Sequence, residues 1–124
     1  MQKRLARKLD LERMLSKVKP HSTPMPSLEQ YTMSVDAAAT MLYIAAYAYG
    51  DIVDKSVLDL GCGTGRLALG AAFLGAESVV GVDIDRKAVN LASENAIAID
   101  LVEKVQWITA FALGMKDMRK QSSH

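Results

Sequence analysis

The sequence predicts an α/β fold built on a parallel β-sheet, because strand and helix patterns alternate through its second half. Short apolar runs at residues 56–60, 78–82 and 104–109 are typical of strands buried in a parallel sheet. Helical patterns at residues 66–74 and 86–99 lie between them. This alternation predicts parallel strands joined by right-handed crossovers through the two helices.

The composition is that of a single soluble globular domain. The chain has 124 residues, of which 50% are hydrophobic, and a net charge of +1, so no overall charge points to nucleic acid or membrane. The longest apolar stretch, residues 37–49, is shorter than the ~20 residues that span a bilayer. Cys62 is the one cysteine, and His21 and His124 are isolated, which disfavours a disulfide or a metal site. We expect a cytoplasmic protein without a membrane partner, with the nucleus as the alternative compartment.

Residues 1–35 are predicted to form a basic amphipathic helix and a proline-rich connector. The first 20 residues carry seven basic side chains and two acidic ones. Apolar residues share one face of a predicted helix over residues 2–18, and all three prolines follow between Pro20 and Pro26. The basic face is interpreted as a solvated surface, with contact to RNA as the alternative.

Residues 36–110 are predicted to form the α/β domain, and residues 111–124 an irregular polar tail. Ser34 is suited to cap a helix that runs through the apolar stretch to Gly50, a residue suited to a left-handed helix end. That helix is apolar nearly all round, so we expect it to be buried.

The glycine-rich segment Asp59-Leu60-Gly61-Cys62-Gly63-Thr64-Gly65 lies where the first strand passes into a helix. Glycines there permit a tight turn and let a ligand approach the main chain. Asp83 closes the second strand, where a carboxylate can accept hydrogen bonds from both hydroxyls of a ribose. Together these features predict a nucleotide-type cofactor at the carboxyl ends of the strands.

Two cofactors use such a site, and the loop favours S-adenosylmethionine over NAD. A dinucleotide loop has the pattern G-x-G-x-x-G, but here the third glycine comes one residue early and Arg66 fills its place. Asp59 would repel a pyrophosphate but suits the ammonium of a methionine moiety. Cys62 is interpreted as a small packing residue of the loop, because no histidine lies nearby in the sequence to activate it as a nucleophile.

A more specific resemblance begins at Leu28-Glu29-Gln30-Tyr31. This segment, the alanine-rich helix after it and the acidic glycine loop resemble the RNA N6-adenosine methyltransferases of the methyltransferase-like-five type and their archaeal relatives. The resemblance covers roughly residues 5–110 and implies a partial Rossmann-like (class I) S-adenosylmethionine-dependent methyltransferase fold with N-terminal helices. It also implies a role beside the cofactor for Gln30, because the family's Glu-Gln-Tyr segment folds over the cofactor.

The expected site therefore consists of cofactor-binding residues, with no catalytic or metal-binding residue assigned. The cofactor-binding residues are Gln30, Asp59, Gly61, Cys62, Gly63, Thr64, Asp83 and Ile84. The resemblance implies RNA, ribosomal RNA in particular, as the substrate and a small zinc-binding activator protein as a partner.

Two features of that family are missing from this sequence. Ala110 stands where the family has an acid that meets the adenine of the cofactor, and no proline follows Pro26, so the family's Asn-Pro-Pro-Phe motif is absent. We therefore expect the cofactor-binding half of an RNA adenine-N6 methyltransferase, truncated after its third strand and inactive alone.

Two alternatives and one consequence remain open at this stage. The chain could be a non-catalytic binding or regulatory fragment that acts through a protein partner. A fragment of a nucleotide-binding oxidoreductase is disfavoured by Asp59 and Arg66. Because no fourth strand is evident beside residues 56–60, that edge of the sheet is expected to be open and to promote self-association.

Overall fold

The computed structural model describes residues 7–20 and 33–110. Its elements, in chain order, are helices at the N-terminal side and then an alternation of strands and helices. They are α1 (Lys8–Leu15), α2 (Val35–Tyr43), the π-helix η2 (Ile44–Ala48), β1 (Ser56–Leu60), α3 (Arg66–Phe73), β2 (Ser78–Asp83), α4 (Arg86–Ala98), the 3-10 turn η3 (Val102–Lys104) and β3 (Val105–Thr109).

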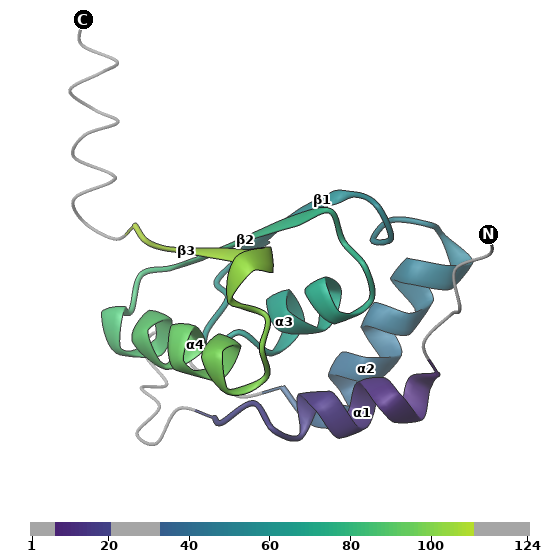
Figure 1. Ribbon diagram of the computed structural model, residues 1–124, viewed down its shortest axis with the longest axis horizontal. Helices are drawn as coiled ribbons and strands as arrows, with labels where there is room; N and C mark the ends of the chain where they lie inside the picture. Colours follow the sequence, from purple (N-terminus) through teal and green to yellow (C-terminus); the bar gives the residue numbers. More distant parts are fainter. Residues whose placement is uncertain (1–6, 21–32, 111–124) are drawn as a thin grey trace, which may run out of the picture.

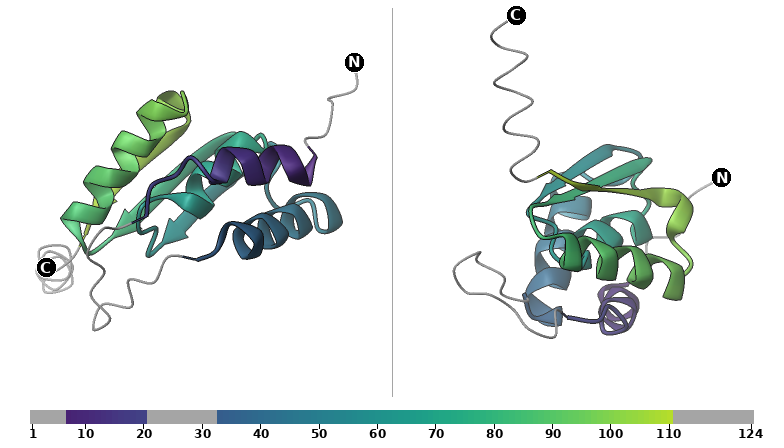
Figure 2. Two further views of the ribbon diagram at one scale, coloured as in Figure 1. Left: turned by 90° about the horizontal axis from the view of Figure 1, so that it is seen from below. Right: turned by 90° about the vertical axis from the view of Figure 1, so that its left-hand side faces the viewer.

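The three strands form a parallel sheet in the order β1-β2-β3, as predicted. Helix α3 connects the first two strands and α4 the next two, and both lie on the same face of the sheet (Figures 1 and 2). Two successive parallel crossovers that proceed in one direction across a sheet place their helices on one face. The carboxyl ends of β1 and β2 therefore lie at one edge of the sheet, beside the N-terminus of α3.

The predicted bounds of these elements are confirmed to within one residue. Strand β1 has the predicted bounds, and β2 extends to Asp83. Strand β3 begins one residue late because Lys104 belongs to the 3-10 turn, and helices α3 and α4 each end one residue early.

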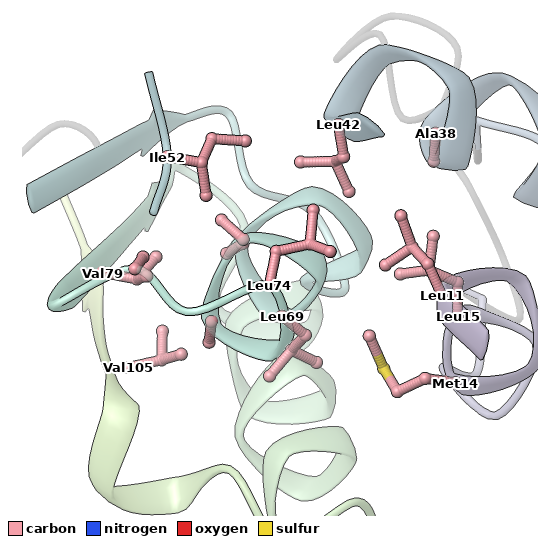
Figure 3. Packing of buried hydrophobic residues seen from close by; sticks show 14 of the residues in the cluster. Leu11, Met14, Leu15, Ala38, Leu42, Ile52, Leu69, Leu74, Val79 and Val105 are labelled. Carbon is pink, nitrogen blue, oxygen red and sulfur yellow. The ribbon is translucent and has the colours of Figure 1, made fainter. Parts of the chain in front are cut away.

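The core lies between the covered face of the sheet and helices α1, α2 and α3 (Figure 3), and Ala96 of α4 also belongs to it. Leu11 and Leu15 of α1 and Leu69 of α3 are fully buried. Gly70 of α3 permits this packing, because a Cβ at that position would lie 2.3 Å from a methyl of Leu42. The N-terminal helix is thus part of the domain core and is not a separate appendage.

The predicted N-terminal helix is confirmed in part. Residues 8–15 are helical, Val18 is buried with the apolar face of α1, and residues 1–6 lie outside the described part of the chain. The predicted cap of the next helix is confirmed, since the Ala37 N–H donates to Ser34 Oγ at 3.1 Å. Most of the proline-rich connector, residues 21–32, also lies outside the described part.

The prediction that the apolar helix before Gly50 is buried was wrong for one of its faces. The α-helix ends at Tyr43 and continues as the π-helix η2, and Gly50 has the expected positive φ, +66°. One face, which includes Leu42, packs on α1 and α3, whereas Met41 is 53% and Ile44 47% exposed. Helices α1 and α3 make the main helix contacts of α2, and they leave Met41 of α2 and Ile44 of η2 about half exposed.

The other face of the sheet is not covered by any element of the described residues (Figures 1 and 2). Side chains alternate along a strand, so Val57 and Asp59 face the helices while Leu58 and Leu60 face away from them. Leu58 is 60% and Leu60 is 73% exposed. We call this surface, with Val80, Val82 and Ile108 of the neighbouring strands, the uncovered sheet face. In the described ranges no helix is long and apolar enough to cross a membrane.

Candidate cofactor-binding site

The glycine loop after β1 folds over the carboxyl end of β2. The backbone N–H groups of Gly61 and Cys62 both donate to the Val82 carbonyl, at 2.7 and 2.9 Å. A third bond closes the turn, from the Gly65 N–H to the Cys62 carbonyl at 3.0 Å. The loop therefore lies beside the acid that follows Val82, which is the juxtaposition that the sequence predicts.

The three glycines of the loop have different roles. All three have positive φ, +77° at Gly61, +56° at Gly63 and +95° at Gly65, which L side chains rarely adopt. A Cβ at Gly61 or Gly63 would meet nothing within 4 Å, so open space lies next to the main chain there. A Cβ at Gly65 would instead lie 2.7 Å from Trp107, a residue of β3. The first two glycines thus leave room for a ligand, and the third leaves room for an indole ring.

Asp83 has both carboxylate oxygens bound to backbone N–H groups. Its Oδ2 accepts from Gly63 at 2.8 Å and its Oδ1 from Asp85 at 2.9 Å. These bonds fix the carboxylate between the glycine loop and the turn before α4. Each oxygen of a carboxylate can accept more than one hydrogen bond, so both can still accept from a ribose hydroxyl.

Asp59 lies on the covered face of β1, under the loop. A backbone hydrogen bond from Ala68, in the first turn of α3, stabilises its charge, but its Oδ2 is buried without a hydrogen-bond partner. Burial, with a smaller contribution from the charge of Asp83, raises the pKa of Asp59 to about 6. An unsatisfied buried carboxylate oxygen is costly, and the described residues supply no hydrogen-bond donor for it.

Cys62 and Thr64 are buried within the loop, with 7% and 8% of their surfaces exposed. Burial, and then the charges of Asp59 and Asp83, raise the pKa of the Cys62 thiol to about 12. A thiol so far from ionisation is a poor nucleophile, which supports its interpretation as a packing residue. Ile84 is different, since it directly follows Asp83 and is 41% exposed.

The structure therefore brings together seven of the eight residues predicted for the site, and Gln30 lies outside the described residues. Two functional candidates were missed, Asn95 and Arg66. The Asn95 side chain donates to the Thr64 carbonyl of the loop. Arg66 directly follows the loop, and its side chain donates to the carbonyls of Val18 and Met33. Asn95 could have been noticed, because it is a polar residue in the same row of α4 as the buried Ala88 and Ala92. The role of Arg66 had no such signal, because the carbonyls that it contacts lie far away in the sequence.

Comparison with known proteins agrees with this geometry. Residues 36–120 match the family model of the ribosomal protein L11 methyltransferase (PrmA). The match thus extends into residues 111–120, beyond residues 5–110 over which the sequence resemblance is expected.

Three of the similar proteins carry the name of an RNA methyltransferase, whereas others are ribosomal protein L11 methyltransferases. The rRNA N(6)-adenosine-methyltransferase METTL5 of Danio rerio is 41% identical over 92 residues, which are 74% of this chain and 44% of that protein. The solved structure of PH1948, a candidate RNA methyltransferase from Pyrococcus horikoshii, matches with a TM-score of 0.75 and 40% identity over 85% of this chain and 51% of that one. An RNA methyltransferase of Salinibacter ruber, solved with S-adenosyl-L-homocysteine, has a TM-score of 0.54 and 27% identity over 62% of this chain and 48% of that one. The chain thus spans about half the length of these proteins.

The fold and the loop define part of a class I S-adenosylmethionine-dependent methyltransferase, with three parallel strands and their flanking helices. The chain belongs to the methyltransferase family described by the ribosomal protein L11 methyltransferase (PrmA) model, and it is a homologue of the RNA N6-adenosine methyltransferases of the METTL5 type. The cofactor of this class is S-adenosylmethionine, whose demethylated product is bound in the Salinibacter ruber structure.

Proposed function

We propose that this chain binds S-adenosylmethionine at the carboxyl ends of β1 and β2 and provides the cofactor-binding part of an RNA adenine-N6 methyltransferase. The proposal rests mainly on open space beside the main chain of Gly61 and Gly63, next to two carboxylates. One of them is hydrogen-bonded to the loop, and the other has a buried oxygen without a partner. Asp83 is held ready for a ribose, and Asp59 has an unsatisfied oxygen for the cofactor's ammonium. Such a set of groups fits the cationic methionine and the ribose better than it fits a pyrophosphate.

The remaining predicted residues support the cofactor in simpler ways. Ile84 offers its exposed apolar surface to the adenine ring, and Cys62 and Thr64 shape the loop from within. Gln30 stays a prediction that rests on the family resemblance. When bound, the cofactor would supply an electrophilic methyl group on its sulfonium; the residues described here bind and orient it.

We further propose that these 124 residues do not transfer the methyl group to RNA by themselves. Transfer to an exocyclic amine requires groups that hold that amine in line with the sulfonium. The family places an Asn-Pro-Pro-Phe motif there, and the sequence contains no such motif. The family resemblance alone supports RNA as the substrate and a small zinc-binding activator protein as a partner, and we propose both for the activity to which this cofactor site contributes.

Calorimetric titration of the chain with S-adenosylmethionine tests the cofactor proposal. Replacing Asp83 with Ala should weaken binding by the worth of a charge-assisted hydrogen bond, ~1.5–3 kcal/mol. Asp51→Ala is the matched control, because Asp51 is exposed and lies before the N-terminal end of β1, whereas the glycine loop follows the C-terminal end. Equal affinities of the Asp83 and Asp51 variants would refute the assigned ribose contact.

Labelled methyl transfer to ribosomal RNA tests the proposed inactivity. We expect no incorporation above the control without enzyme. Incorporation that disappears in Asp83→Ala would show that these residues suffice for the reaction.

A second candidate function, a non-catalytic binding module, is favoured by the uncovered sheet face. Leu58 and Leu60 are exposed side by side on it, and exposed apolar patches are typical of protein interaction sites. Its test is the state of association of the purified chain. Binding of the cofactor without any association would favour the first function over the second.

A further inference from the structure

Asn95 joins the N-terminal segment of the chain to the glycine loop. Its side chain lies on α4, is 2% exposed and makes three hydrogen bonds. The Lys19 N–H donates to its Oδ1 at 3.0 Å, and its amide nitrogen donates to the carbonyls of Lys19 at 3.1 Å and Thr64 at 3.0 Å. The amide thereby uses both N–H donors and its oxygen on backbone groups 45 positions apart in the sequence.

Arg66 makes a second link between the same parts of the molecule. It is the first residue of α3, and its guanidinium donates to the Met33 carbonyl and, at 3.1 Å, to the Val18 carbonyl. Val18 and Met33 belong to the two N-terminal stretches of the described chain, residues 7–20 and 33 onward. One side chain thus binds both stretches at once.

Both links reach the loop next to the same residue, Gly65. Thr64, whose carbonyl accepts from Asn95, precedes it, and Arg66 follows it. Gly65 itself has φ +95°, and a Cβ there would lie 2.7 Å from Trp107, so the chain adopts a left-handed conformation in a place without room for a side chain. Gly63, which faces the open space, is two residues away.

We propose that Asn95 and Arg66 are positioning residues for the cofactor loop, which they hold in its binding conformation by fastening it to the backbone at Val18, Lys19 and Met33. This inference rests on the proposed binding of S-adenosylmethionine to that loop. Its consequence is an energetic coupling between cofactor binding and the packing of the N-terminal segment. Such coupling is reciprocal, so the cofactor also slows hydrogen exchange at the Lys19 amide.

Three single variants of the full chain test the proposal. Asn95→Ala removes all three bonds, and Asn95→Asp keeps an acceptor for Lys19 but loses both donors. Arg66→Lys keeps the charge but cannot reach two carbonyls with one planar group. The matched controls are Asn90→Ala, on an exposed position of the same helix, and Arg13→Lys, on an exposed position of α1.

The first measurement is amide hydrogen exchange at Gly63 and Gly65 in the absence of cofactor. We expect faster exchange at both amides in the Asn95 and Arg66 variants and unchanged exchange in the controls. The second measurement is the dissociation constant of S-adenosylmethionine, taken at a temperature at which denaturation curves show each variant to be folded. We expect it to increase about threefold to tenfold, the worth of one lost hydrogen bond.

The outcomes separate this proposal from the function on which it rests. If the unmodified chain does not bind S-adenosylmethionine, the proposed function fails, and the exchange data alone decide whether the loop is held by these residues. If the variants only lower the free energy of unfolding, and loop exchange and affinity match the controls, both residues are merely structural and the proposal is overturned. Should Asn95→Ala fail to fold, Arg66→Lys provides the same two readouts.

Discussion

The Gly63 backbone N–H donates a 2.8 Å hydrogen bond to Asp83 Oδ2, so the loop after β1 is tied to the carboxylate at the end of β2. The same carboxylate accepts from the Asp85 N–H, which opens the turn into α4. One side chain thus organises both backbone segments that face the proposed ribose position.

Replacing Asp83 with Ala should therefore destabilise the free protein as well as weaken cofactor binding. Two backbone N–H groups lose their acceptor, at a cost of about 1–3 kcal/mol in the free energy of unfolding. Urea denaturation without cofactor measures this, with Asp51→Ala as the control. If Asp83→Ala has the same unfolding free energy as the control variant and the unmodified chain, Asp83 contributes to ligand binding and not to stability.

The pKa of Asp59 predicts how cofactor affinity depends on pH. Because this pKa is raised to about 6, the carboxyl is protonated below that pH and cannot attract the ammonium of the cofactor. Affinity should therefore rise between pH 5 and pH 7, by up to about tenfold per pH unit below the pKa. Calorimetry across this range measures the effect. Asp59→Asn should bind weakly at every pH in this range, and an unmodified chain with constant affinity would contradict the assigned contact.

Asp59 should also lower the stability of the free protein at neutral pH. A carboxyl whose pKa is raised on folding is destabilising when ionised, so its contribution worsens as the pH rises from about 4 to about 6. The difference in unfolding free energy between Asp59→Asn and the unmodified chain should consequently be about 1–2 kcal/mol more in favour of the variant at pH 7 than at pH 4. Urea denaturation of both chains at the two pH values checks this. If this difference between the two chains is the same at pH 4 and pH 7, the charge of Asp59 has no energetic cost.

Replacing Gly65 with Ala should mainly lower stability, whereas replacing Gly61 with Ala should mainly lower cofactor affinity. At Gly65 the new Cβ would lie 2.7 Å from Trp107 and adopt a strained φ, which should cost about 2–4 kcal/mol of stability. At Gly61 the Cβ meets open space, so stability should fall by only about 1–2 kcal/mol, whereas cofactor affinity should fall strongly. Denaturation and calorimetry on both variants distinguish the two. Equal losses of stability would contradict the separate roles assigned to these glycines.

The uncovered sheet face should make the isolated chain self-associate. Strand β1 is an edge strand within the described residues, and Leu58 and Leu60 expose their side chains along it. Leu58→Lys should shift the chain toward the monomer in size-exclusion chromatography with light scattering, whereas Ile97→Lys, on an exposed position of α4, should not. A stable monomer of the unmodified chain at tens of micromolar would refute the prediction.

Local sequence patterns predict the strands and helices of the second half well. The apolar run 56–60 and the glycines after it are read from neighbouring residues, and the structure places both as predicted. Burial of the helix after Ser34 was predicted from its composition, and this failed for Met41 and Ile44 because burial depends on which helices lie beside them. Apolar composition indicates that a helix can be buried, but it does not indicate how many of its faces are covered.

The bonds that shape the loop could not be predicted from the sequence, for the same reason. Arg66 binds a carbonyl 48 residues away, and Asn95 bonds Lys19 at a separation of 76. Trp107 lies 42 positions after Gly65, yet its ring leaves no room for a Cβ there. Such contacts depend on the crossover geometry of the whole domain and leave no periodic signal in the chain.

The most direct test of the central claim is calorimetric titration of the unmodified chain with S-adenosylmethionine, S-adenosylhomocysteine and NAD in parallel. We predict saturable binding of the first two and no heat of binding for NAD, because Asp59 repels a pyrophosphate and the open glycines lie beside two carboxylates. Binding of NAD with comparable affinity, or no binding of either methionine derivative, would contradict the assignment of this loop as a methyltransferase cofactor site.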